Sequence, residues 1–142
     1  MSFETEGSGF VIFKKETLGD SDPLILALEQ HDGVLDLPKG RIDDGESSLE
    51  AAKRECFEEC SVVITDNDML FQDSSPLKHG VLETFCATTD AVPSITVNPH
   101  SNILEHAGFK WVTKEEFCGN CLEFLVPAVE HFYSEHKNSY NA

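Results

Sequence analysis

Short apolar stretches rich in β-branched and aromatic residues recur along the chain, and polar residues typical of turns separate them. Runs of this length and composition indicate β-strands. The expected strands span residues 9–13, 24–28, 34–37, 81–88 and 108–112. Residues 19–23, with their Gly, Asp and Pro, predict a hairpin connection between the first two strands. Residues 64 and 65 are a candidate for one further short strand.

In residues 48–60 the apolar positions change to a helical period. Ser47 and Glu50 have capping-box spacing, which predicts a helix that begins directly after Ser47. At about 100° per residue, one apolar stripe of this helix faces the core. The stripe comprises Leu49, Ala52, Cys56 and Cys60. Glu50 and Arg54 are four residues apart in the favourable order, so we expect them to pair on the outer side.

A second amphipathic helix is expected at residues 122–136, with Pro127 in its first turn or at a kink. Strands on both sides of the first helix, and a second helix near the end, predict an α/β fold with a mixed sheet between helices. The 142 residues fit a single domain, residues 1–142. The polar end, at about 137–142, is expected to be frayed.

Three carboxylates of the first helix, Glu55, Glu58 and Glu59, lie together beside its apolar stripe. Like charges at this spacing repel, and the negative end of the helix dipole adds to the cost. A cation would offset both costs. Mg²⁺ is the natural candidate, because it takes carboxylate oxygens and is often shared with substrate phosphates. Gly40 and Gly45 allow the preceding loop to fold back over the helix.

Residues 40–62 resemble the Nudix box. The fixed positions of the box are occupied here by Gly40, Glu46, Arg54, Glu55, Cys56, Glu58, Glu59 and Val62. The chain departs in one place, because Ser61 stands where the box has a glycine that leaves the helix in a left-handed turn. The resemblance implies the α/β/α Nudix sandwich, with a mixed central sheet between helices, and a hydrolase of phosphoanhydride bonds.

A downstream segment is similar to the diadenosine tetraphosphate hydrolases of that superfamily. Residues 105–111, EHAGFKW, look like the stretch in which a Glu-His pair precedes an aromatic-basic-Trp strand, and residues 37–40 resemble the Pro-Lys-Gly entry of that subfamily. That subfamily also has an aromatic residue just before Pro-Lys-Gly and a tyrosine past the box for adenine stacking. This chain has Val-Leu-Asp at 34–36 and Phe-Gln-Asp at 71–73 in the corresponding stretches.

The expected metal site follows from these positions. Glu58 and Glu59 would hold Mg²⁺, for which Mn²⁺ is a candidate substitute, and the Lys39 carbonyl would be a further ligand. Glu55 would bind the metal or deprotonate the attacking water. Glu105 would be another ligand or the alternative base, since the loop glutamate of the resembled subfamily approaches the metal. The remaining expected roles belong to Arg54, which would organise the acids, and to Glu46, which would support the loop.

Four side chains are candidates for contacts with substrate phosphates. Lys39 is the strongest, because it stands beside the loop glycine. Lys78 matches a phosphate-contacting lysine of the resembled subfamily. His31 lies on the loop before the box and His106 beside Glu105, so either could reach a phosphate.

The formal net charge of −16 favours a small phosphorylated nucleotide as the partner. Proteins that bind nucleic-acid polymers neutralise phosphates with Lys and Arg, and 10 basic residues against 26 acidic ones make a broad basic groove unfavourable. No apolar run is long enough to span a membrane. Five cysteines and no signal pattern predict a reducing, cytoplasmic compartment. A zinc site formed by Cys56, Cys60, Cys118 and Cys121 is the less favoured alternative to buried free thiols.

Three functions remain open from the sequence. The first is hydrolysis of diadenosine tetraphosphate to ATP and AMP. The second is the same chemistry on nucleoside triphosphates, ADP-ribose, nucleotide sugars or diphosphoinositol polyphosphates, although the scarcity of basic residues disfavours the inositol compounds. The third is a catalytically silent domain that senses nucleotides, which the complete set of acidic positions disfavours.

Overall fold

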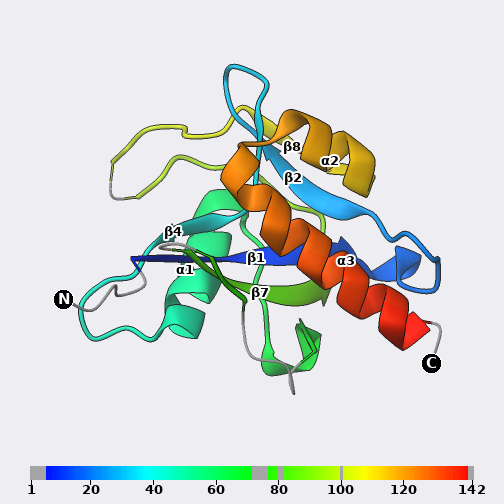
Figure 1. The fold of residues 1–142 in the computed structure, drawn as a ribbon. Helices are drawn as coiled ribbons and strands as arrows, with labels where there is room; N and C mark the ends of the chain where they lie inside the picture. The colour runs from blue at the N-terminus through cyan, green and yellow to red at the C-terminus, as the bar shows by residue number, and fades with distance from the viewer. Residues whose placement is uncertain (1–5, 72–76, 80–81, 100, 141–142) are drawn as a thin grey trace.

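The computed structural model describes residues 6–71, 77–79, 82–99 and 101–140, and it forms one mixed sheet covered on both faces (Figure 1). The strands are β1 (Gly7–Lys14), β2 (Ile25–Glu29), β3 (Leu35–Asp36), β4 (Lys39–Arg41), β5 (Met69–Leu70), β6 (Leu77–His79), β7 (Leu82–Thr89) and β8 (Gly108–Val112). The α-helices are α1 (Ser48–Cys60), α2 (Lys114–Asn120) and α3 (Val126–Tyr140). The 3₁₀ turns are η1 (Lys15–Thr17), η2 (Asp66–Asp68) and η3 (Glu123–Leu125).

The sheet has the strand order β3-β2-β1-β7-β5, with β4 also paired to β1, β6 to β7 and β8 to β2. The central pair, β1 and β7, is parallel from Gly7 opposite Leu82 to Lys14 opposite Thr89. The other strand pairs are antiparallel. The sequence prediction of an α/β fold with a mixed sheet is therefore confirmed.

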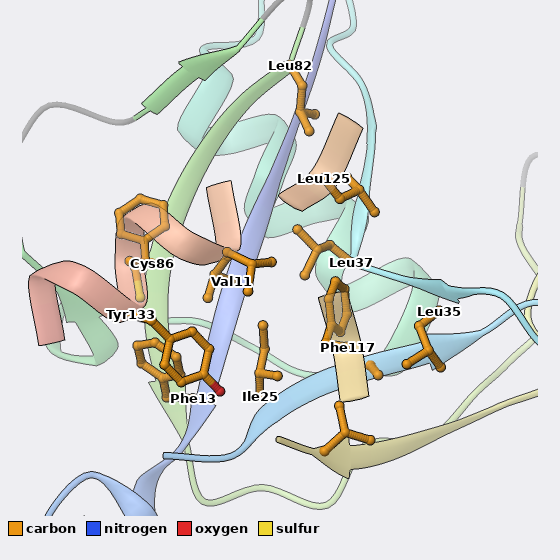
Figure 2. Close-up of a cluster of buried hydrophobic side chains, with 14 residues drawn as sticks. Val11, Phe13, Ile25, Leu35, Leu37, Leu82, Cys86, Phe117, Leu125 and Tyr133 are labelled. Carbon is orange, nitrogen blue, oxygen red and sulfur yellow. The ribbon is translucent and has the colours of Figure 1, made fainter. Parts of the chain in front are cut away.

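Side chains of β1 alternate between two cores, which fixes which helix covers which face. Val11 and Phe13 pack with residues of α2 and α3, including Phe117, Val129 and Tyr133. Figure 2 shows the Tyr133 ring against Phe13, with the centroids 4.9 Å apart. Phe10 and Ile12 point to the other face and pack with the apolar stripe of α1. The two helical layers therefore lie on opposite faces of the sheet.

Most of the expected elements are present, with local corrections. The helix at 48–60 and the strand at 108–112 have the expected bounds, and the chain between β1 and β2 connects an antiparallel pair. Residues 64 and 65 form no strand. β4, β5, β6 and α2 were not expected. α3 begins at Val126 rather than at 122, with Pro127 in its first turn, and it continues through Tyr140.

None of the helices in the described part of the chain has both the length and the apolar character needed to cross a lipid bilayer.

Candidate functional site

The site begins where α1 packs against β1 and β4. Ser47 caps α1 by accepting the backbone N–H of Glu50, and the Glu50 carboxylate accepts the N–H of Ser47 in return. On β4, Gly40 lies so close to the Glu55 carboxylate that a Cβ at this position would overlap it. Glycine is needed here for close approach, because it lets the acidic face of the helix lie directly against the strand.

Arg54 is the centre of the acidic cluster. Its Nη1 donates to Glu55 Oε1 at 2.9 Å and to Glu58 Oε2 at 3.0 Å. Its Nε and Nη2 donate to the two oxygens of Glu46 at 2.7 and 3.1 Å, a bidentate arrangement that fixes the plane of the guanidinium. One side chain therefore binds three carboxylates that would otherwise repel one another. Glu50 does not form the expected pair with Arg54, because its carboxylate accepts the backbone N–H of Ser47 at the helix cap instead.

The same arginine fastens the loop that precedes the helix. Arg54 Nη2 donates to the Arg41 carbonyl oxygen at 2.9 Å and lies 3.4 Å from Asp43 Oδ2. Glu46 also accepts the Asp43 N–H at 3.0 Å. The hydrogen bonds from Arg54 hold the pKa of Glu46 below its usual value, although desolvation acts in the opposite direction. The loop is thus held over α1, as the two bracketing glycines led us to expect.

Glu59 is the most buried acid of the cluster, with a relative exposure of 8%. Its Oε1 accepts the backbone N–H of Lys39 at 2.9 Å. Burial, together with the charges of Asp36 and Glu55, raises the pKa of Glu59 to about 9. An ionised Glu59 therefore requires a compensating positive charge close by.

The pKa of Glu55 is also raised, mainly by burial and further by the charges of Glu58 and Glu105. The hydrogen bond from Arg54 acts in the opposite direction but does not cancel this shift. Carboxylate oxygens are the ligands that Mg²⁺ prefers, so the chemistry of this cluster fits that ion. A bound Mg²⁺ would also supply the positive charge that an ionised Glu59 requires. Among the described residues, no three acids or histidines stand close enough to hold a metal ion together. Joint ligation by Glu55, Glu58 and Glu59 would therefore require their side chains to rearrange, and Arg54 at present binds the first two.

Two adjoining hollows form the cleft above these acids. One has a volume of about 400 Å³ and is lined by Lys39, Gly40, Arg41, Asp43, Arg54, Glu55, Glu59, Asn98, Ser101 and Glu105. The other has a volume of about 530 Å³ and is lined by Gln30, His31, Asp32, Asp36, Lys39, Glu59, Glu105 and His106. Lys39, Glu59 and Glu105 border both, so the two hollows adjoin at these residues. Among the expected metal ligands on α1, Glu55 and Glu59 line the cleft, whereas Glu58 is not among its lining residues.

Asp36 is a site residue that the sequence did not suggest. It is 4% exposed, its Oδ2 lies 3.3 Å from His106 Nε2, and its Oδ1 lies 3.4 Å from Lys39 Nζ. Burial opposes its charge, but the His106 hydrogen bond and the Lys39 ammonium outweigh burial and lower the pKa of Asp36. An acid between Leu35 and Leu37, directly before Pro-Lys-Gly, was the available signal.

The other candidate phosphate contacts lie in different surroundings. His31 Nε2 is 2.7 Å from the Leu104 carbonyl oxygen, so it links the loop after β2 to the loop that carries Glu105. His106 is buried against Asp36. Lys78 lies on β6 opposite Glu83, but its side chain is outside the described part of the structure. Arg41, Asn98 and Ser101 border the cleft and were not expected there.

The cysteines divide between the two faces of the sheet. Cys56 and Cys60 belong to the α1 core, with their sulfurs 3.9 Å apart. Cys118 and Cys121 pack against the core on the α3 side. The four thiols therefore cannot surround one zinc ion, and the alternative of a zinc site is wrong.

Comparisons with known proteins identify relatives of this chain. The model of the NUDIX domain matches residues 9–134. A Bacillus subtilis (strain 168) protein named "Putative 8-oxo-dGTP diphosphatase" is 30% identical over 141 residues, which cover 94% of this chain and 80% of that protein.

Solved structures share the fold at lower sequence identity. A Caenorhabditis elegans Ap4A hydrolase in a binary complex matches with a TM-score of 0.69 and 19% identity, over 91% of this chain and 96% of that one. The MutT protein from Methanosarcina mazei Go1 matches with a TM-score of 0.62 and 18% identity, over 96% and 99% of the two chains. At these identities the likeness concerns the fold alone.

Proposed function

Because the chain belongs to the NUDIX domain family, the family of the Nudix hydrolases, we propose that it is a Mg²⁺-dependent enzyme that hydrolyses a phosphoanhydride bond of a nucleotide. The leading candidate substrate is diadenosine tetraphosphate, which would give ATP and AMP. The observation that carries this proposal is the buried Glu59, held by the Lys39 N–H beside the acids that Arg54 organises. The cleft lined by Lys39, Glu55 and Glu59 is open to a phosphorylated ligand.

Each side chain of the cluster then has a defined task. Glu58 and Glu59 would hold the metal, with Glu55 and Glu105 as further oxygen donors and the Lys39 carbonyl as another. When bound, Mg²⁺ supplies charge neutralisation for the phosphates and lowers the pKa of water. Lys39, whose ammonium is held by Asp36, would bind a phosphate oxygen at the border of the two hollows.

The hydrolytic step needs a base for one water molecule. The water oxygen would bond to a phosphorus atom, the bridging P–O bond would break with its electrons on the leaving phosphate, and a carboxylate would take the water proton. Glu55 suits this task because burial raises its pKa, which makes it a better proton acceptor than an exposed glutamate. Glu105, across the cleft, is the alternative base.

Nucleoside triphosphates are the second candidate substrates. The name of the B. subtilis relative favours them, because that protein shares 30% identity over nearly the whole of this chain. The two candidates use the same acids and differ in what surrounds the nucleoside.

Product analysis would test the proposal. The protein would be incubated with Mg²⁺ and, separately, diadenosine tetraphosphate, dGTP, 8-oxo-dGTP, a nucleotide sugar and ADP-ribose, beside Glu58→Gln. Glu130→Gln, at an exposed position on α3, is the matched control. Release of ATP and AMP from the dinucleotide, lost in Glu58→Gln only, supports the leading candidate. Cleavage of another substrate but not of the dinucleotide would support phosphoanhydride hydrolysis and reject diadenosine tetraphosphate as the substrate. Nucleotide binding without turnover would favour a sensing domain.

A further inference from the structure

His106 borders the larger hollow of the cleft but is almost fully buried, with a relative exposure of 5%. Its Nε2 lies 3.3 Å from Asp36 Oδ2. The pKa of Asp36 lies below the ordinary 3.8, so at neutral pH its carboxylate is ionised and only accepts hydrogen bonds. The Nε2 of His106 therefore carries the proton of this contact, and this nitrogen is not available to a substrate phosphate.

Asp36 connects His106 to Lys39. Its Oδ2 faces the imidazole, and its Oδ1 lies 3.4 Å from Lys39 Nζ and accepts the backbone N–H of Leu37 at 2.9 Å. Because Asp36 is buried, these protein groups rather than bulk water satisfy its oxygens. Contacts on both oxygens thus fix the plane of the carboxylate.

The Lys39 ammonium depends on this carboxylate for its direction. A lysine side chain has about 2 kcal/mol of rotamer entropy to lose when it is held in one conformation, so a fixed ammonium needs a restraint. The centroid of the Phe124 ring is 5.9 Å from Lys39 Nζ, which is near the outer limit of about 6 Å for a cation–π contact. The ion pair with Asp36 is therefore the stronger restraint. Lys39 borders both hollows, so its direction decides which space receives its charge.

The same imidazole anchors the loop beside Glu105. His106 directly follows this acid, and the next residue, Ala107, donates its backbone N–H to the Glu29 carbonyl oxygen at 2.7 Å. Two consecutive residues after Glu105 are thus attached to the sheet. His106 therefore links the loop that carries one acid of the cleft to the segment that carries Lys39.

We propose that His106 is a positioning residue, which donates to Asp36 so that Asp36 holds the Lys39 ammonium at the border of the two hollows. This inference rests on the proposed function, in which Lys39 binds a phosphate oxygen, and it assigns to His106 a role without direct contact with phosphate. Loss of the donor would leave Asp36 Oδ2 buried and unpaired. That oxygen would then compete for the Lys39 ammonium and draw it away from the phosphate.

A double-mutant cycle in ligand binding tests this role. His106→Leu removes the donor and Lys39→Met removes the ammonium, and each is prepared alone and in combination. The probe is inorganic tripolyphosphate with excess Mg²⁺, titrated by calorimetry, which requires neither a base nor turnover. We expect His106→Leu to weaken tripolyphosphate binding about fivefold when Lys39 is present, and less than about twofold when it is replaced by methionine.

Three further variants separate positioning from a general effect on the fold. His106→Gln keeps an amide N–H near the place of Nε2, so it should retain most of the affinity. His106→Asn has a shorter amide that ends before Asp36, so it should behave as His106→Leu does and replaces that variant if the leucine protein does not fold. His131→Leu makes the same exchange on α3, at a residue that borders neither hollow, and should leave the affinity unchanged.

Equal losses of affinity with and without the Lys39 ammonium would show that His106 acts on the fold alone, and they would overturn the proposal. An unchanged affinity in both donor-removing variants would overturn it as well. A wild type that does not bind tripolyphosphate would reject the phosphate site at Lys39 and this role with it. A wild type that binds tripolyphosphate but hydrolyses no nucleotide would refute the proposed hydrolysis, while the cycle would still decide the role of His106.

Discussion

Glu59 Oε1 accepts the backbone N–H of Lys39 at 2.9 Å, across 20 residues of sequence. This hydrogen bond joins the acidic face of α1 to the strand that carries Pro-Lys-Gly. It also orients the carboxylate that burial makes hardest to ionise. One contact therefore fixes the position of this acid relative to the backbone of Lys39.

Metal-free stability should depend on pH through Glu59. Its pKa is about 9 in the folded chain against the ordinary 4.5. The unfolded chain thus releases the proton first, and the contribution of Glu59 to the free energy of unfolding falls as pH rises through this range. Glu59→Gln cannot ionise, so in EDTA at pH 8 it should be more stable than the wild type by more than about 1 kcal/mol. Urea unfolding at pH 5 and pH 8 would measure the difference, and an equal difference at both values would contradict the assignment.

Added Mg²⁺ should make the wild type more stable than Glu59→Gln. A cation compensates the charge of Glu59 in the wild type but gains little from the glutamine variant. The Tm of the wild type should therefore rise on addition of Mg²⁺, and more at pH 8 than at pH 6, because fewer protons compete for the carboxylate. Thermal melts with and without Mg²⁺ would show this, and no shift at either pH would argue against a metal at Glu59.

Arg54→Lys should lose both activity and stability. A single ammonium cannot reach the carboxylates of Glu46, Glu55 and Glu58 together, as the guanidinium does. We expect hydrolysis to fall by about two orders of magnitude and the free energy of unfolding by about 1–2 kcal/mol, discounted for the partial exposure of the cluster. Lys53→Met is the neighbouring control, since Lys53 pairs with the exposed Asp66 and should cost below about 1 kcal/mol. Equal effects of the two substitutions would show that Arg54 has no organising role.

Gly40→Ala should damage the site through sterics alone. The added Cβ would overlap the Glu55 carboxylate and force it from its place against β4. Because the carboxylate is the flexible end of its side chain, a cost below about 1 kcal/mol in unfolding free energy is expected, with a larger loss in kcat than in apparent nucleotide affinity. Gly19→Ala provides the comparison, because no heavy atom lies within 4 Å of the added Cβ there. Chemical denaturation and steady-state kinetics of both variants would measure the effect, and a fully active Gly40→Ala would place Glu55 outside the reaction.

Asp36→Asn should weaken both the fold and nucleotide binding. The substitution removes the charge that holds His106 and Lys39, so we expect a loss of about 1–3 kcal/mol at pH 7. The folded pKa of Asp36 lies below the ordinary 3.8. The difference from the wild type should therefore be complete above about pH 5 and shrink as pH falls below 3.8. Urea unfolding across this range is the measurement, with Asp44→Asn, an exposed loop position, as the control. A difference that persists unchanged at pH 3 would assign the effect to packing.

The helix that carries the acids could be predicted closely from the sequence because its signals are local. The capping pair, the helical period and the absence of glycine and proline lie within residues 47–60. Ser61, at φ 62°, adopts the left-handed conformation that the Nudix box usually gives to glycine, and its hydroxyl donates to the Ser94 carbonyl oxygen at 3.0 Å. The departure at this position therefore leaves the helix end intact.

The parts that were missed depend on contacts between distant residues. β4 contains Gly40 and follows a proline, and it is a strand because it pairs with β1. Asp36 acquires its surroundings from His106, 70 residues away. Phe124 lies beside Lys39 because the neighbouring Leu125 anchors η3 in the core. No local pattern carries this information, since each of these placements follows from the tertiary fold.

Backbone hydrogen bonds fasten both ends of the loop between β7 and β8 to the rest of the fold. Its start is held where the Ser94 N–H donates to the Cys60 carbonyl at 2.8 Å, and its end where the Ala107 N–H donates to the Glu29 carbonyl at 2.7 Å. The segment between them carries Asn98 and Ser101 to the rim of the cleft. Insertions or deletions at the tip of this loop can therefore remodel the entrance while the acids of α1 stay in place. The tip of this loop, rather than the part near Glu105, is therefore the segment to randomise when a new specificity is sought.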